Sequence, residues 1–291
     1  MLNILVTGKS GQLGSEIHAI REKYPEYHFV FTNSKTLDIT NHEAVKVFVV
    51  ANNIQAIINC AAYTAVDKAE SESKRANDVN HLAVANLATV AKAYSIKLIH
   101  ISTDYVFDGT NYKPYTESDA PNPQSVYGQT KLDGELAVQK INPKNSIIIR
   151  TSWVYSRFGN NFVKTMLRLG VERDTLNVVA DQIGSPTNAA DLAKAILDIV
   201  PQLNNKKVEV FHYSNEGVCS WYDFAQAIFE ISNIEVKLKP IPSVAYPTPA
   251  KRPFYSVLKK ERVREKFNLN PSHWKNSLFI ELDIMKKIKN H

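Results

Sequence analysis

Short apolar runs alternate with longer stretches of helical period along the first half of the chain. The apolar runs predict buried strands at 2–7, 28–32, 55–60, 96–102 and 146–151. Apolar positions at helical spacing predict helices at 13–23, 41–52, 75–95 and 127–141. Asn41 is suited to cap the second of these helices. Apolar strands that alternate with helices form parallel sheets covered on both faces, so the pattern predicts an α/β fold with a doubly wound parallel sheet.

The pattern changes after residue 151. Strand signals become sparse, and prolines become frequent, at positions 186, 201, 240, 242, 247, 249 and 253. We expect residues 1–151 to form the sheet domain and residues 152–291 to form mainly a smaller substrate-binding lobe. A later apolar run at 208–213 is expected to return to the first sheet.

A glycine-rich turn lies between the first predicted strand and the first predicted helix. Residues 8–14 read Gly-Lys-Ser-Gly-Gln-Leu-Gly, with glycines at Gly8, Gly11 and Gly14. Glycines let the backbone approach a pyrophosphate, and the start of a helix offers free N–H groups to it. The turn therefore predicts a Rossmann dinucleotide site. Its spacing, one residue wider than G-x-G-x-x-G, resembles that of short-chain dehydrogenase/reductase enzymes.

The segment after the second predicted strand bears on the choice of cofactor. An acid there binds the ribose 2′-OH of NADH, whereas a base accommodates the 2′-phosphate of NADPH. Residues 32–35 read Thr-Asn-Ser-Lys and contain no acid. Lys35 either meets a 2′-phosphate or is simply solvated. We expect NADPH, with NADH also accepted.

A Tyr-x-x-x-Lys pair, Tyr127 and Lys131, opens the predicted helix at 127–141. Residues four apart lie on one face of a helix. A tyrosine with a pKa near 10 is a poor acid at neutral pH, and a nearby ammonium favours its phenolate. Tyr127 can then give a proton to a carbonyl oxygen while hydride reaches the carbon. Thr103, at the end of the fourth predicted strand, is placed to hydrogen-bond the same oxygen.

Composition is that of an ordinary globular protein, with 44% hydrophobic and 22% charged residues. Cys60 and Cys219 lie far apart without metal-ligand spacing, and we expect Cys60 to be a buried free thiol in a reducing compartment. The sequence shows no signal peptide and no apolar stretch of membrane-spanning length, so we expect a cytoplasmic protein that does not bind membranes.

The net charge is +6, and much of the excess comes late in the chain. These basic residues either form a solvated surface or attract an anionic, phosphate-bearing small molecule. They accompany no nucleic-acid reader motif, so we expect no nucleic-acid partner. The residues are Lys251, Arg252, Lys259, Lys260, Arg262, Arg264, Lys286, Lys287 and Lys289.

Seven stretches together resemble the dTDP-4-dehydrorhamnose reductase family of extended short-chain dehydrogenases/reductases. They are GKSGQLG (8–14), NCAAYTAVDKAESE (59–72), STDYVFDG (102–109), YGQTKLDGE (127–135), RTSWVYSRFGNNFVKTML (150–167), DQIGSPT (181–187) and YPTPAKRP (246–253). The resemblance implies reduction at C4 of dTDP-4-dehydro-6-deoxy-L-mannose, with hydride from NADPH or NADH, to give dTDP-L-rhamnose.

The resemblance also assigns roles to single residues. Around the cofactor, it implies pyrophosphate contacts from Gly11, Gln12 and Leu13, adenosine contacts from Asp38 and Ile39, and cofactor contacts from Ala61, Ala62 and Tyr63. At the reaction centre, it implies that Thr103 tunes the carbonyl, Tyr127 donates the proton and Lys131 orders the ribose. Around the sugar nucleotide, it implies contacts from Asp104, Tyr105 and Trp153.

Two further expectations concern metal and oligomer. Some members of this family form dimers bridged by Mg²⁺ through glutamates. Glu16 matches one such position, whereas Ala190 replaces another, with Asp191 beside it. We therefore assign no metal ligand and keep a homodimer as an open possibility.

The residues disfavour one alternative function and leave two others open. Related dehydratases carry Asp-Glu after the strand-end threonine, whereas Tyr105 stands at the Glu position here, so simple reduction fits better than elimination. A reductase or epimerase of a different nucleotide sugar would share most of these motifs. A non-catalytic regulatory subunit, like the methionine adenosyltransferase beta subunit, could also retain the cofactor turn.

Overall fold

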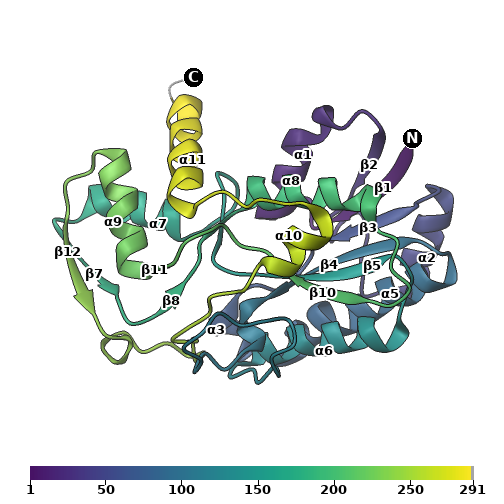
Figure 1. Ribbon diagram of the computed structural model, residues 1–291, viewed down its shortest axis with the longest axis horizontal. Helices are drawn as coiled ribbons and strands as arrows, with labels where there is room; N and C mark the ends of the chain where they lie inside the picture. The colour runs from purple at the N-terminus through teal and green to yellow at the C-terminus, as the bar shows by residue number, and fades with distance from the viewer. Residues whose placement is uncertain (290–291) are drawn as a thin grey trace.

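A computed structural model describes residues 1–289; the side chain of Lys289 and residues 290–291 lie outside the described part. Its centre is a six-stranded, wholly parallel sheet in the order β10-β5-β4-β3-β1-β2 (Figure 1). The strands are β1 (Leu2–Thr7), β2 (Tyr27–Phe31), β3 (Ala56–Asn59), β4 (Lys97–Thr103), β5 (Ser146–Thr151) and β10 (Glu209–His212). The predicted strands and the α/β fold class are confirmed.

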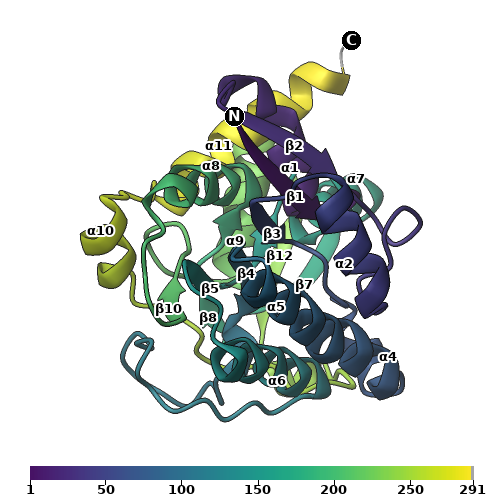
Figure 2. The ribbon, with the colours of Figure 1, turned by 90° about the vertical axis from the view of Figure 1, so that its right-hand side faces the viewer.

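Helices cover both faces of this sheet, because its strands are apolar on both sides. One face packs against α1 (Gln12–Ile20), α8 (Ala189–Ile199) and α10 (Glu261–Phe267). The opposite face packs against α2 (His42–Ala51), α5 (Ala83–Ala93) and α6 (Val126–Ile141). Figure 2 shows the sheet between α1 and α8 on one side and α5 and α6 on the other.

Two of the helices begin at polar caps in the sequence. Asn41 accepts a hydrogen bond from the backbone N–H of Ala44 at 3.0 Å, as predicted for an N-cap. Ser125 caps α6 through the N–H of Gly128 at 3.1 Å.

The predicted helix at 75–95 is in fact interrupted. It consists of α4 (Ser73–Asn77), a π-helical turn (Asp78–Leu82) and α5, while the short α3 (Val66–Ala69) precedes it.

A smaller lobe surrounds a separate apolar cluster. It contains the helices α7 (Phe162–Glu172), α9 (Trp221–Ser232) and α11 (Trp274–Lys289). Three two-stranded pairs complete it: β7 (Thr175–Val179) with β12 (Lys237–Ile241), β8 (Ile183–Gly184) with β11 (Cys219–Ser220), and β6 (Val154–Tyr155) with β9 (Thr187–Asn188). The chain leaves this lobe to form β10 beside β5, as the run at 208–213 predicted.

Two expectations about single side chains need correction. Cys60 is a free cysteine but only partly buried, because it lies in the turn that follows β3 rather than inside the strand; Cys219 is the buried one. Lys260 does not belong to a solvated basic surface. It is 6% exposed and donates to the Ser214 hydroxyl at 3.3 Å. No helix of the described residues is long and apolar enough to cross a bilayer.

Candidate active site

The glycine turn after β1 is shaped by contacts that exclude side chains. A Cβ on Gly8 would lie 2.7 Å from the backbone nitrogen of Ala61, and Gly8 has a φ of +70°. A Cβ on Gly14 would lie 2.4 Å from the Gly8 carbonyl oxygen. Gly11 precedes α1 and brings no side chain to its first N–H groups. Since those groups have no intrahelical acceptor, the turn can receive an anion.

One side of this turn is a loop from the smaller lobe. The Gln12 side chain donates to the carbonyl of Val154 at 3.3 Å and accepts from the Asn161 amide at 3.0 Å. A Cβ on Gly159 would approach Gln12 at 3.1 Å. Sequence reasoning assigned Gln12 but not this loop, although the loop lies within the quoted stretch at 150–167. The Leu13 side chain packs into the sheet core, which leaves only its backbone facing the turn.

The segment after β2 lies at the surface. Asp38 is exposed and accepts hydrogen bonds from the backbone and the hydroxyl of Thr40, at 3.0 and 2.7 Å. Ile39 is 7% exposed and packs with α2 and α5. Lys35 is exposed and thus free to meet a phosphate or water.

A residue that sequence reasoning missed fixes the segment after β3. This segment contains Ala61, Ala62 and Tyr63. Asn80 is fully buried in the π-helical turn. Its amide accepts from the Tyr63 N–H at 2.8 Å and donates to the Tyr63 carbonyl at 3.1 Å. It also donates to the Thr130 hydroxyl on α6 at 3.2 Å. Asn80 therefore fixes this segment relative to the helix that carries Tyr127.

Tyr127 and Lys131 lie on the buried face of α6, at the carboxyl end of β4. Burial raises the pKa of Tyr127 to about 12, and the neighbouring Thr103 hydroxyl opposes this rise. Lys131 is 2% exposed, and its ammonium donates to the Ile101 carbonyl oxygen at 2.6 Å. Burial lowers the pKa of Lys131 to about 8. A Cβ on Gly128 would clash with the carbonyl of Tyr105, so a glycine there lets α6 approach the turn that follows β4 closely.

The residues after Thr103 complete this group. Thr103 donates to the Asp104 carboxylate at 3.0 Å and accepts from the Tyr105 N–H at 3.2 Å. Asp104 is 2% exposed, and burial raises its pKa to about 6. The Tyr105 ring meets the Tyr127 ring edge-on at 5.4 Å, and burial raises the pKa of the Tyr105 phenol.

Trp153 lies in the smaller lobe rather than in the cluster around Tyr127. Its φ is +50°, a left-handed conformation that is strained for a tryptophan. Its ring stacks on Trp221 with centroids 3.5 Å apart. On Gly184, a Cβ would lie 2.6 Å from the indole. Trp153 is therefore held between Trp221 and Gly184, in the lobe that is expected to bind the sugar nucleotide.

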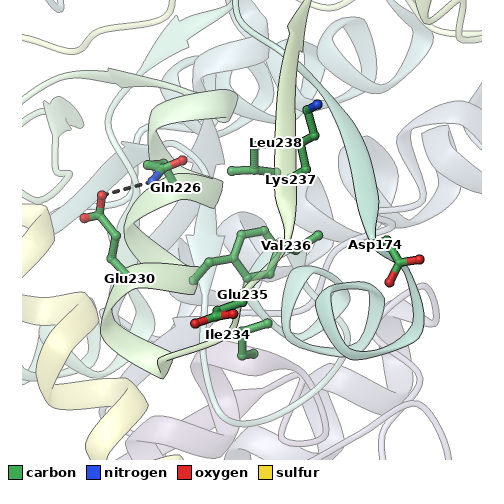
Figure 3. A pocket seen from close by; sticks show the side chains of 9 residues that line it. Asp174, Gln226, Glu230, Ile234, Glu235, Val236, Lys237 and Leu238 are labelled. Carbon is green, nitrogen blue, oxygen red and sulfur yellow. Dashed lines mark hydrogen bonds between the residues drawn. The ribbon is translucent and has the colours of Figure 1, made fainter.

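A cavity of about 640 Å³ opens beside Trp221. Its charged lining residues are Arg173 and Arg252, and Tyr246 adds an aromatic wall. Arg252 also pairs with Asp67 at 2.8 Å. A second hollow, between α9 and β12, is lined by surface side chains such as Gln226 and Lys237 and holds none of the predicted site residues (Figure 3).

Glu16, which matches a metal-bridging position of some family members, points inward. Glu16 is fully buried, accepting from the Ser156 hydroxyl at 2.6 Å and from Arg157 at 2.9 Å. Asp191 accepts from the Asn215 amide at 2.6 Å. Within residues 1–289, no group of three or more His, Cys, Asp or Glu side chains is arranged to hold a metal ion.

The parallel sheet with its glycine turn, Thr–Tyr–Lys group and second lobe defines the class of extended short-chain dehydrogenases/reductases. The family model described as "RmlD substrate binding domain" matches residues 2–286. A dTDP-4-dehydrorhamnose reductase of Aggregatibacter actinomycetemcomitans is 41% identical over 96% of this chain and 97% of its own. The chain therefore belongs to this RmlD family.

Two further relatives show the range of the family. The crystal structure of dTDP-4-dehydrorhamnose reductase from Bacillus anthracis in complex with NADP superimposes with a TM-score of 0.92 at 39% identity, covering 98% of this chain and 100% of that one. A protein of Streptomyces niveus, named dTDP-4-keto-6-deoxy-D-glucose reductase, is 38% identical over 94% of both chains.

Proposed function

We propose that the protein reduces the C4 keto group of dTDP-4-dehydro-6-deoxy-L-mannose (dTDP-4-dehydro-L-rhamnose) to give dTDP-L-rhamnose, with hydride from NADPH or NADH. The relative from A. actinomycetemcomitans carries the name of this activity, and the relative from B. anthracis was crystallised with NADP. The observation that carries the proposal is the convergence of Thr103, Tyr127 and Lys131 at the carboxyl end of β4, where all three side chains are at most 8% exposed and Lys131 donates to the Ile101 carbonyl at 2.6 Å.

The glycine turn fits a dinucleotide, because it is too tight for side chains on Gly8 or Gly14, which would clash with the backbone. The backbone is therefore left bare where a pyrophosphate would approach. When bound, the nicotinamide cofactor supplies the hydride. Gly8, Gly11, Gly14 and the backbone of Gln12 and Leu13 would hold the pyrophosphate. The adenosine would lie against the segment with Asp38 and Ile39, and the remainder against Ala61, Ala62 and Tyr63.

The proton is given by Tyr127. With a pKa of about 12, its phenol is protonated at neutral pH, as a proton donor must be. Thr103 aligns the phenol and the substrate oxygen. Lys131, with a pKa of about 8, is mostly charged at neutral pH and stabilises the phenolate that the transfer leaves behind. Its ammonium would also bind the nicotinamide ribose.

The surroundings of Tyr105 favour reduction over elimination. An elimination needs a base at this position, and burial makes the Tyr105 phenol a weaker acid, so that it stays protonated. Asp104, Tyr105 and Trp153 would contact the sugar nucleotide. The cavity with Trp221, Arg173 and Arg252 has the aromatic and cationic lining that suits a base and a diphosphate.

The test couples the protein to its substrate supply. dTDP-4-dehydro-L-rhamnose is made in situ from dTDP-glucose by a dehydratase and an epimerase, and oxidation of NADPH or NADH is followed by absorbance. We expect oxidation that requires the epimerase and disappears in Tyr127→Phe. Oxidation without the epimerase would assign the D-gluco ketone named for the S. niveus relative. No oxidation by protein that binds NADPH would refute both assignments and favour a regulatory subunit.

A further inference from the structure

A buried polar layer crosses the sheet beneath Tyr127. Five strands contribute side chains to it in two rows, and each of these side chains is at most 3% exposed. Thr7, Asn59 and His100 form one row, and Arg150 and His212 form a second row two residues further along. The Thr7 hydroxyl donates to Asn59 at 2.6 Å, and the Asn59 amide lies 3.0 Å from Nδ1 of His100. Charges placed in such a layer interact strongly, because little water screens them.

Helix α6 adds two charged side chains to this layer, Lys131 and Glu135. They are four residues apart, the spacing at which a lysine and a glutamate on one helix form an ion pair. That pair is not formed. Lys131 takes part in none of the ion pairs among residues 1–289, and its ammonium instead donates to the carbonyl of Ile101.

Glu135 is paired with Arg150 instead, although its charge still raises the pKa of Lys131 against the effect of burial. Nε of Arg150 donates to one carboxylate oxygen at 2.9 Å, and its Nη2 donates to the other at 2.6 Å. The guanidinium is fixed from the opposite side by the Phe107 ring, 5.0 Å from its centroid. Glu135 is 1% exposed and Arg150 is 3% exposed, so both carboxylate oxygens are hydrogen-bonded inside the protein and away from solvent.

Stability alone is a weak explanation for such a pair. Desolvation of two buried charges offsets much of their attraction, and well-packed apolar residues often do as well. The position of the pair, one turn along α6 from Lys131, suggests another role.

We propose that Arg150 is a positioning residue for the proton transfer: by binding both oxygens of Glu135, it keeps that carboxylate from neutralising the ammonium of Lys131. The charge of Lys131 then remains available to the Tyr127 phenolate and to the cofactor ribose. This inference rests on the proposed function of Tyr127 and Lys131.

The other ionisable groups that face Lys131 do not control how much of its charge is neutralised. His100, from β4, is held neutral because burial and the charge of Lys131 keep its pKa well below the usual value. Asp104, after β4, acts on Tyr127 and is the same in every variant considered below. Glu135 on α6 and Arg150 on β5 are thus the pair whose removal changes the charge around Lys131.

The test breaks the same ion pair from each side. Arg150→Met leaves an unpaired carboxylate, which favours the protonated forms of both Lys131 and Tyr127. The fall of kcat at alkaline pH should therefore move upward by about one pH unit, and kcat at neutral pH should fall about tenfold because Tyr127 becomes a weaker acid. Glu135→Gln leaves an unpaired cation and should move the alkaline fall downward by a similar amount. The double variant should return it to the wild-type position.

The outcomes separate this role from a structural one. Opposite displacements by the two single variants support the proposal, since a loss of packing would not reverse its sign. Displacements in the same direction, or none in either variant, overturn it. If Arg150→Met does not fold, Glu135→Gln and the double variant decide, and an unmoved alkaline fall in Glu135→Gln overturns the proposal.

A second readout does not depend on turnover. NADPH affinity, measured by the quenching of protein fluorescence, should fall several-fold in Arg150→Met and recover in the double variant. If the wild-type chain binds NADPH but reduces none of the keto-sugars, the proposed function fails. The NADPH titration would still test whether Arg150 keeps Glu135 from neutralising Lys131. Equal NADPH affinity in Arg150→Met and wild type at all pH values contradicts the proposal.

Discussion

The clearest perturbation of the sugar-nucleotide lobe is a single methyl group on Gly184. In Gly184→Ala, the new Cβ would lie 2.6 Å from Cε2 of Trp153 and 2.8 Å from both Cζ2 and Nε1. Ordinary contacts of this kind are about 3.5 Å or longer, so the indole must move by roughly 1 Å. It cannot move freely, because Trp221 stacks on it with centroids 3.5 Å apart. The φ of Gly184 is not in the left-handed region, so the effect belongs to the clash.

Overpacking of this kind costs about 1–3 kcal/mol. If Trp153 contacts the sugar nucleotide, displacing it should lower kcat/KM for dTDP-4-dehydro-L-rhamnose by about 5- to 150-fold. Gly184 is not part of the turn at 8–14, although Val154 beside Trp153 accepts a hydrogen bond from Gln12, so NADPH affinity should fall by less than kcat/KM does. Steady-state kinetics with varied sugar nucleotide and fluorescence titration with NADPH give the two numbers.

Gly14→Ala is the matched control. It adds the same methyl group, 2.4 Å from the Gly8 carbonyl oxygen, so it should weaken NADPH first. A double variant, Gly184→Ala with Trp153→Ala, should show no loss beyond that of Trp153→Ala, since the clash is gone. The reasoning is refuted if Gly184→Ala weakens NADPH as much as the sugar nucleotide, or if it leaves both unchanged.

Three other predictions concern the reaction centre. Tyr127→Phe should lower kcat by about 10²- to 10⁴-fold while NADPH affinity stays within about twofold, because only the proton donor is lost; full activity in this variant would sink the proposed role. Lys131→Ala should weaken NADPH binding and lower kcat together, and a variant that binds NADPH normally would contradict the ribose contact. Burial raises the pKa of Asp104 to about 6, so its contribution to stability is present below its ordinary pKa and is lost as pH rises toward about 6. Asp104→Asn should abolish this part of the pH dependence of Tm, and an unchanged dependence would show that other groups cause it.

The sheet and the reaction centre could be predicted because both depend on local signals. The strand at 146–151 is centred on three consecutive isoleucines, and it forms β5 with every residue buried. The pair Tyr127 and Lys131 has helical spacing, and Ser125 begins the helix directly before it. Such patterns involve neighbours along the chain, so one sequence is enough to find them.

The missed features depend on contacts between distant segments. Gln12 meets Asn161 across 149 positions of the sequence, and Asn80 meets Thr130 across 50. The π-helical turn that places Asn80 has the same apolar pattern as an ordinary helix. The paired strands β6, β8, β9 and β11 have two residues each, too few to show any alternation.

The placement of β10 has a consequence for any attempt to divide the protein. β10 pairs with β5 although the whole first part of the smaller lobe lies between them in sequence. A chain cut after residue 151 would leave β5 as an open edge with apolar residues on both faces, and it would also lose α8 from its place against α1. Exposed apolar edges recruit strands from other molecules. We expect such a fragment to aggregate, and a fragment that also supplies residues 187–215 through a linker to resist aggregation better.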